Sequence, residues 1–541
     1  MASLSLIFFI IIVFLSQLSI LGFGQITKNI INFNSFYNEK YLDKFIDFFF
    51  GIIILNIIGF LLYFFSITSF YVNLFILIFG LFIYIKNRRL ESQHIEIKTF
   101  ILLLIMFVGI LISKTHEDYI SYHFKYIDII SNSEFIMGLG NQQINFVYTP
   151  FFSYLQKIFI LPIFQYKLLH IPIYLIFFNF CFFLMSDVLD KKKITLTNLL
   201  LLIFLLTKFT RLSEYGYDYP AGFLLLSIII IFFYHNRNSE PTNPFLFLVL
   251  FIYAISIKVT SLFFLPILLV ILFKSVFTNK KKMTFLYKNL RVIFFCIALL
   301  TLVILDSFFK SGCFVYFIEL TCAGKELIPW SVDYSEITDF SYKVNLWAKG
   351  YYHQKAIIND PELFLKIYNW LPIWYKNYFY YKISEFVILL IFISLIIFAF
   401  NYKTLKKNKN HFNYFELILL ISSFISLILW ISYLPQLRFG FYSIICLYIF
   451  ILKYFFEINI NLKNKKAFYS LIILALTIYV SYNLKRIIFE FERNDRHKFI
   501  NFPFESTTNF ALEKNFKNRS IIKANENIKT NEYYIFKYIT K

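Results

Sequence analysis

Long apolar stretches recur along most of the chain and are separated by short polar segments. A helix that crosses a bilayer needs about 20 mainly apolar residues, and about fourteen stretches approach that length. They lie at 4–22, 46–67, 68–85, 99–113, 169–187, 196–210, 220–234, 244–258, 260–276, 291–309, 384–401, 413–431, 439–455 and 467–482. The pattern predicts an all-α polytopic bundle of about 13–14 spans. The first stretch has no basic segment before it and no small-residue cleavage site, which predicts a retained span and not a signal peptide.

The composition excludes a soluble multi-domain enzyme. Of the 541 residues, 59% are hydrophobic, 22% are aromatic and only 16% are charged, and the mean hydropathy is +0.65. Soluble domains carry about 25% charged residues, so lipid is the expected solvent for most of the chain. We expect one multi-span membrane domain over residues 1–482 and a small extracytoplasmic segment over 483–541.

Basic residues gather in the short segments between pairs of spans, and the positive-inside rule places these clusters in the cytoplasm. They are Lys86, Arg88 and Arg89; Lys191, Lys192 and Lys193; Lys280, Lys281 and Lys282; Lys403, Lys406, Lys407 and Lys409; and Lys463, Lys465 and Lys466. The net charge of +21 then serves orientation and contact with anionic lipid headgroups. It needs no nucleic acid as a partner.

This orientation holds along the chain only if segment 151–165 is an interfacial or re-entrant helix that does not cross. Five segments then face the extracytoplasmic side: 114–150, 211–219, the turn near 258, 310–383 and 432–438. Nearly all the residues with chemical potential lie in these five segments.

The first extracytoplasmic loop begins THEDYISYH, directly after an apolar span. A carboxylate at this boundary, Glu117 or Asp118, suits a general base that accepts a proton from a sugar hydroxyl. Alternatively, both acids cap the next helix and His123 is a packed surface residue. A metal site of His116, Asp118 and His123 is a third possibility, but the spacing matches no strong ligand pattern.

Two short motifs in the extracytoplasmic segments carry weaker signals. The turn GLGN, with Gly138, Gly140 and Asn141, offers backbone amides that suit an anionic headgroup. The segment RLSEYGYDYP places Arg211 and Asp218 beside three tyrosines. That mixture suits sugar hydroxyls and ring faces, and equally an interfacial aromatic belt.

Single cations stand at the extracytoplasmic ends of two apolar helices. Lys258 lies in SIKVTS and Arg438 in YLPQLRFGFY. Cations at this depth bind phosphate, Arg with a two-donor fork and Lys as a point charge, or simply reach the headgroups as snorkelling side chains.

The long loop 310–383 combines aromatic residues with two cysteines. Its tryptophans, Trp330, Trp347, Trp370 and Trp374, suit stacking on sugar rings or anchoring of interfacial helices. Cys313 and Cys322 can form a disulfide if the loop is extracytoplasmic. The five cysteines of the chain show no metal-ligand spacing.

Several of these pieces occur together in a known order. DYISYH, GLGN, SIKVTS, SGCFVY followed by PWSV and NLWAKG, and RFGF resemble a family of bacterial inner-membrane proteins of domain-of-unknown-function status. The layout of that family is similar to the GT-C membrane glycosyltransferases. The resemblance covers roughly residues 100 to 445.

The resemblance implies a GT-C-like fold in the bacterial inner (plasma) membrane, a polyprenyl-phosphate-linked sugar as donor and a glycan or glycolipid as acceptor. Asp118 becomes the candidate base, Glu117 its neighbour or substitute and His123 an orienting partner. Arg438 and Lys258 become the phosphate-side cations. Further candidate binding residues are Gly138, Gly140, Asn141, Arg211 and Trp347. No cofactor is implied beyond the lipid-linked sugar, and a requirement for a divalent metal stays open.

Two other functions remain in competition. A transporter or flippase for lipid-linked saccharides would show inverted repeats, broken spans and ionisable residues near the bilayer midplane. A non-catalytic assembly protein would show no site beside Asp118. The polar groups of this sequence gather at one face, which favours the glycosyltransferase hypothesis.

Overall fold

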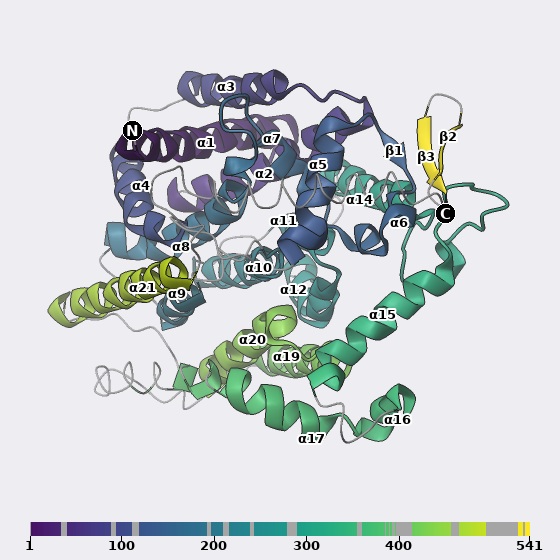
Figure 1. Cartoon of the computed structure of the whole chain (residues 1–541). Helices are drawn as coiled ribbons and strands as arrows, with labels where there is room; N and C mark the ends of the chain where they lie inside the picture. Colours follow the sequence, from purple (N-terminus) through teal and green to yellow (C-terminus); the bar gives the residue numbers. More distant parts are fainter. Residues whose placement is uncertain are drawn as a thin grey trace.

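The computed structural model describes residues 2–33, 40–87, 93–110, 118–191, 196–208, 216–238, 243–277, 289–353, 360–384, 386–388, 390–391, 395, 414–455, 465–493, 529–533 and 536–540. They form a mainly helical bundle (Figure 1). The long helices are α1 (Ala2–Ile30), α2 (Lys40–Phe64), α3 (Phe70–Lys86), α4 (Gln93–Met106), α8 (Ile171–Lys191), α9 (Leu196–Lys208), α10 (Asp218–Asn238), α11 (Pro244–Ile257), α12 (Leu265–Phe277), α14 (Leu290–Ser311), α19 (Tyr414–Tyr433), α20 (Leu437–Phe455) and α21 (Lys465–Arg493). Shorter α-helices are α5 (Phe124–Asn132), α6 (Leu139–Gln142), α7 (Ser153–Ile158), α15 (Tyr334–Ala348), α16 (Pro361–Leu365) and α17 (Leu371–Trp374).

Five described helices are long and apolar enough to cross a membrane, which indicates a multi-pass membrane protein. They cover Ile7–Ile30, Tyr41–Phe64, Tyr166–Met185, Leu290–Ser311 and Tyr414–Tyr433. Shorter apolar helices, among them Asp218–Tyr234 and Pro244–Ile257, accompany them. Most of the predicted span 384–401 lies outside the described residues.

Burial separates a central helix from peripheral ones. The apolar window of α8 is 100% buried, whereas that of α14 is 22% buried and that of α19 is 28% buried. The open faces of the peripheral helices are lined by large apolar side chains such as Phe294 on α14 and Phe424 on α19. Since a spanning helix exposes apolar side chains to acyl chains, α14 and α19 present the lipid-facing surface.

Glycine allows the closest helix pair to form. An added Cβ at Gly51 of α2 would lie 2.0 Å from the Ile20 backbone oxygen of α1, and one at Gly24 would lie 1.6 Å from the Asp47 oxygen. Helices in membranes associate largely through such close backbone approach. The α1–α2 contact therefore depends on these two residues having no side chain.

Segment 151–165 contains no helix long enough to cross a membrane, which agrees with the interfacial or re-entrant helix expected from the basic clusters. It contains the short buried helix α7, whose Leu155 N–H donates to Asn56 Oδ1 at 2.6 Å. Asn73 Nδ2 donates to the backbone oxygens of Lys157 and Ile160 at 2.9 and 3.0 Å. Irregular backbone inside a bundle needs such partners, because no water is available to it.

One small sheet is an addition to the predicted all-helical fold. Strands β2 (Lys529–Tyr533) and β3 (Phe536–Thr540) form a hairpin, and β3 pairs in parallel with β1 (Ile136–Met137). Lys537 also forms an ion pair with Glu134 at 2.6 Å. The C-terminal segment therefore closes over the loop between α5 and α6. Helix α21 continues past the predicted domain boundary at residue 482.

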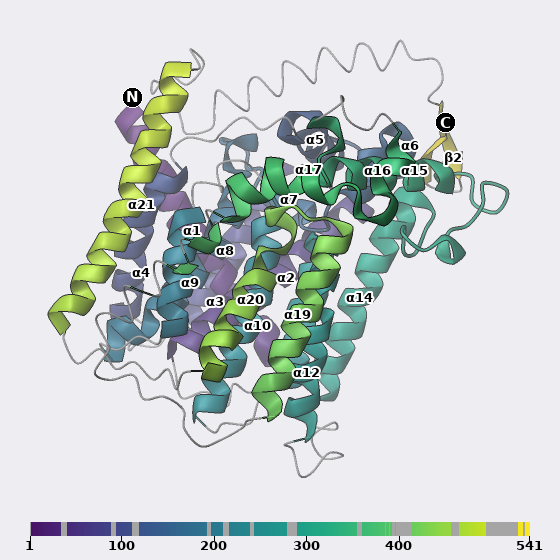
Figure 2. The same cartoon turned by 90° about the horizontal axis from the view of Figure 1, so that it is seen from below.

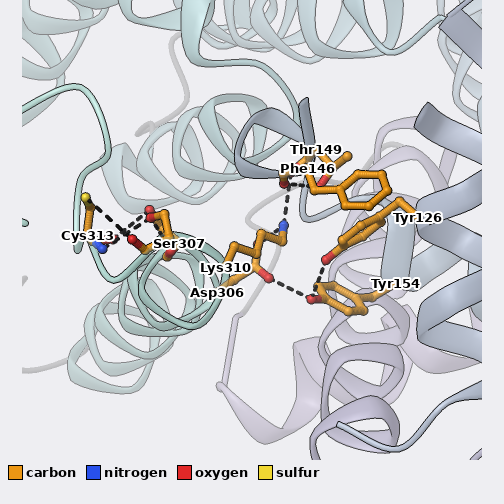
Figure 3. A network of polar contacts seen from close by, with 9 residues as sticks. Tyr126, Phe146, Thr149, Tyr154, Asp306, Ser307, Lys310 and Cys313 are labelled. Atoms are coloured by element: carbon orange, nitrogen blue, oxygen red, sulfur yellow. Dashed lines mark hydrogen bonds and ion pairs between the residues drawn. The ribbon is translucent and has the colours of Figure 1, made fainter. Parts of the chain in front are cut away.

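A buried polar network joins α14 to α5 and α7 (Figure 3). Asp306 accepts hydrogen bonds from Lys310 Nζ at 2.6 Å and from Tyr154 Oη at 2.7 Å. The Tyr154 hydroxyl lies 2.9 Å from that of Tyr126, and Lys310 also donates to the Thr149 backbone oxygen at 3.0 Å. Asp306 and Lys310 thus pair with each other, and Asp306 also binds the Tyr154 hydroxyl. These bonds fix α14 to the segment that leads from α5 to α7.

We expect Asp306→Leu to destabilise the protein, because it leaves the Lys310 ammonium buried without its counter-charge. The cost of such a break is about 3–5 kcal/mol. The double variant Asp306→Leu/Lys310→Met should recover much of it. Thermal unfolding of purified protein in detergent measures both changes, and equal melting temperatures for the single and double variants would contradict this account.

Candidate functional site

Four charged side chains from separate parts of the sequence meet at the ends of their helices. Lys258 Nζ lies 2.8 Å from Asp218 Oδ1, and Arg438 Nε lies 3.7 Å from Asp218 Oδ2. Arg438 Nη1 also lies 3.9 Å from Asp118 Oδ2. The structure thus brings together Asp118, the candidate base, with Lys258 and Arg438, the candidate phosphate-side cations. They lie around Asp218, an acid that was not among the predicted site residues.

Local structure explains why each charge stands there. Asp218 is the first residue of α10, where the positive end of the helix dipole favours a carboxylate. Lys258 has an extended backbone and is the C-cap residue of α11. It is also the N-cap residue of the short helix Val259–Phe264 that follows. Arg438 is the second residue of α20, and Asp118 directly precedes the short helical segment Tyr119–His123. Helix ends are natural places for charges in a membrane bundle, because they lie nearest the headgroups.

Asp218 is the organising residue of the cluster, and sequence reasoning did not select it as a site residue. Its side chain is 10% exposed, against 38% for Asp118. Each of its two oxygens faces a different cation. The sequence signal was an acid placed directly before an apolar helix in RLSEYGYDYP, but nothing in that segment identifies a partner for it.

Aromatic rings hold the two cations. The Arg438 guanidinium carbon lies 4.9 Å from the ring centre of Trp347 and 4.8 Å from that of Phe439. Lys258 Nζ lies 4.8 Å from the same Phe439 ring. These are cation–π contacts. Trp347, on α15, therefore belongs to the site, and Phe439 is a second residue that sequence reasoning missed.

Helix α15 and its successors form the wall that carries Trp347. Figure 2 shows α15, α16 and α17 crossing one end of the bundle, over α19 and α20. Gln436 Nε2 donates to the Ala348 oxygen at 2.8 Å, and Trp374 Nε1 donates to the Pro435 oxygen at 2.7 Å. These bonds fix the turn before α20, and thereby Arg438, to the wall.

His123 lies in an aromatic pocket beside the cluster. Its ring centre is 4.1 Å from that of Tyr122 and 4.5 Å from that of Tyr217, which donates its hydroxyl to Gln156 at 2.7 Å. Burial raises the pKa of Tyr122 far above its usual value, and the negative charges of Asp118 and Asp218 raise it further. The Tyr122 hydroxyl is therefore protonated at neutral pH and can donate a hydrogen bond.

The GLGN turn, which the sequence suggested as a site for an anionic headgroup, is packed against other parts of the protein. Gly138 has φ +71° and donates its N–H to the Phe309 oxygen at 2.7 Å. A Cβ on Gly140 would lie 2.6 Å from Val147. Asn141 Nδ2 donates to the oxygens of Trp330 and Ile539, each at 2.9 Å. The turn joins the end of α14 to the C-terminal hairpin, so we assign it a structural role and no longer a headgroup-binding one.

The remaining candidates divide into two groups. Glu117 and Arg211, like His116, lie outside the described residues. Trp330, Trp370 and Trp374 are buried. Within the described part of the chain, no group of three His, Cys, Asp or Glu side chains could hold a metal ion.

The arrangement combines three chemical functions within a few ångströms. Asp118 is a half-exposed carboxylate, Arg438 and Lys258 are cations with spare donors, and Trp347 offers a ring beside them. An exposed carboxylate next to a guanidinium can accept a proton from a hydroxyl while the cation binds an anion.

Comparison with known proteins gives one match. A family model described as Domain of unknown function (DUF8201) covers residues 4–446, a range that includes all four charges of the cluster. No curated protein and no solved structure matches the chain.

Asn141→Ala should lower stability, because the Trp330 and Ile539 oxygens lose their buried donor. We expect a loss of about 1–3 kcal/mol. Gln142→Ala, in the same short helix, is the matched control and should change little. Thermal unfolding in detergent measures both, and equal effects of the two substitutions would contradict the structural role of Asn141.

Proposed function

The chain belongs to the DUF8201 family, and we propose that it is a membrane glycosyltransferase of GT-C-like architecture that takes its sugar from a polyprenyl phosphate. The observation that carries this proposal is the meeting of Asp118 with Arg438 and Lys258 at the ends of apolar helices. A lipid-linked phosphate lies at the same depth as such helix ends. The acceptor would be a surface glycan or a glycolipid.

The reaction assigns each charge one task. Asp118 accepts the proton of the acceptor hydroxyl as that oxygen attacks the anomeric carbon of the sugar. The bond between this carbon and the phosphate oxygen breaks, and the polyprenyl phosphate leaves with the bonding electron pair. Arg438 and Lys258 stabilise the added negative charge on the phosphate. Asp218 positions both cations, and Tyr122 is an additional hydrogen-bond donor beside them.

Burial supports this division between the two acids. Asp218 is nearly covered and engages both cations, so it suits a fixed positioning role. Asp118 is more exposed, and its ion pair with Arg438 is long at 3.9 Å. This exposure leaves the Asp118 carboxylate accessible to a substrate.

The disulfide supports an extracytoplasmic orientation of the site. Cys313 and Cys322 are bonded, and disulfides persist in oxidising compartments. The loop that carries them leads into α15 and hence to Trp347. We therefore infer that the cluster lies on the extracytoplasmic side of the bacterial inner membrane, as expected if the positive-inside rule assigns the basic clusters of the sequence to the cytoplasm.

The distribution of charge argues against the transporter alternative. On α10, α11, α14 and α20 the described ionisable residues, such as Asp218, Asp306 and Arg438, lie toward the helix ends. A transport pathway needs such groups near the bilayer midplane. An enzyme that acts at the membrane surface needs its ionisable residues near the helix ends, which is where these residues lie.

We expect Asp118→Asn to lower the rate of sugar transfer by about 10²–10⁴-fold, the usual contribution of a general base. Arg438→Lys should keep part of the activity, because Lys retains the charge but not the two-donor fork, and Arg438→Ala should be nearly inactive. The assay is complementation of the surface-glycan defect of a deletion strain, with protein level and membrane insertion monitored. Full complementation by Asp118→Asn and Glu117→Gln, separately and together, would favour a transporter or an assembly protein.

Asp218→Asn should lower the melting temperature, because two partly buried cations lose their shared carboxylate. A loss of about 1–3 kcal/mol is expected. A polyprenyl phosphate should then stabilise this variant more than the wild type, since its phosphate replaces the missing charge. Asp339→Asn removes an exposed ion pair with Lys343 and is the control, with little expected change. If the lipid phosphate does not stabilise Asp218→Asn, the proposal that this cluster binds phosphate is wrong.

A further inference from the structure

The loop after α14 contains a compact hairpin whose tip is apolar. The Cys313–Cys322 disulfide closes it, and these two residues also form an antiparallel bridge. Phe314 N–H donates to the Thr321 oxygen at 3.1 Å. The Thr321 hydroxyl donates to the Val315 oxygen at 2.8 Å and accepts from the Val315 N–H at 3.0 Å. These backbone and hydroxyl groups at the base of the hairpin therefore form their hydrogen bonds within the hairpin.

One side of the hairpin is anchored in the protein. Cys313 is fully buried, in a cluster with Val147, Val332 and Ile337. The Tyr316 ring packs edge-on against Tyr148, with ring centres 4.9 Å apart. The hairpin is consequently held in place and does not rest on its disulfide alone.

The other side presents large apolar side chains. Leu320 is 98% exposed, and Phe317 and Ile318 are also exposed. Glu319 is the single charged residue between the two cysteines. An exposed apolar tip on an anchored hairpin is unfavourable in water and marks a contact with another apolar phase.

The position of the hairpin identifies that phase. It follows directly on α14, the helix with the smallest buried share among the five candidate spans of the described residues. Phe294, Ile297 and Leu300 continue the apolar exposure along α14. Figure 2 shows the loop between α14 and α15 at the outer edge of the bundle, beside the end of α14. The exposed tip thus lies at the C-terminal end of a helix whose other half presents exposed apolar side chains to lipid.

We propose that this hairpin inserts its tip, Phe317, Ile318 and Leu320, into the bilayer leaflet at the C-terminal end of α14. Its partner is the boundary between lipid headgroups and acyl chains, where apolar side chains on a partly polar segment are stable. The disulfide keeps the tip preformed, so that insertion requires little further ordering. This role is independent of the sugar-transfer reaction.

The test uses the full chain in phosphatidylcholine nanodiscs, with Cys181, Cys296 and Cys446 replaced by Ala. Leu320→Cys carries an NBD fluorophore, and Phe317→Cys gives a second position. Ser335→Cys, on the exposed polar side of α15, is the matched control. Non-reducing peptide mapping establishes that Cys313 and Cys322 remain paired. Doxyl-labelled lipids quench a probe in the acyl region, and aqueous Co²⁺ quenches a probe in water.

We expect doxyl lipids to quench the probe at Leu320→Cys or Phe317→Cys several-fold more than the probe at Ser335→Cys, and Co²⁺ to show the reverse order. Equal Co²⁺ quenching at all three positions would overturn the proposal. A tip that is open to Co²⁺ in nanodiscs but protected in native membranes would also overturn it, because it would show a protein partner.

Discussion

The constraint on which this structure depends is that polar groups inside a lipid-solvated bundle must find partners within the protein. Asp306 and Lys310 meet it by pairing with each other and with Tyr154 (Figure 3). Asn56 and Asn73 meet it by binding the backbone of α7. Because water cannot replace these bonds, each fixes one segment to another, and together they hold α5, α7 and α14 as one frame.

Charged groups in the candidate site are also paired within the protein, but they differ in how far they are exposed. Asp218 pairs with two cations and is nearly covered, as a structural charge would be. Asp118, however, is 38% exposed and lies 3.9 Å from Arg438. The difference in exposure separates a charge that holds the site together from one that can meet a substrate. Aromatic rings on Trp347 and Phe439 complete the surroundings of the cations without neutralising them.

Both functional hypotheses depend on the segment that runs from the end of α14 to α17. Its first part carries the disulfide hairpin beside the lipid-facing helix α14. Its later part crosses the end of the bundle and places Trp347 against Arg438. A segment that is bound to the protein at several points can carry a membrane contact at one end and a substrate wall at the other.

The sequence by itself determined the properties that depend on neighbouring residues. Span length and apolarity identified the polytopic helical class. The alternation of the basic clusters required a segment at 151–165 that does not cross. The edges of apolar stretches pointed to Asp118, Lys258 and Arg438. Sequence spacing left the Cys313–Cys322 pair open, because a disulfide needs both compartment and geometry.

Only the tertiary structure decided which of these residues meet and what the others do. Asp218 became the centre of the cluster because α10, α11 and α20 bring their ends together, which no local pattern records. The GLGN turn, with Gly138 and Asn141, became a packing junction because β3 arrives from nearly the other end of the chain. Long-range packing sets these roles, since the same residue types serve equally well as ligands, caps or fillers until their neighbours are fixed.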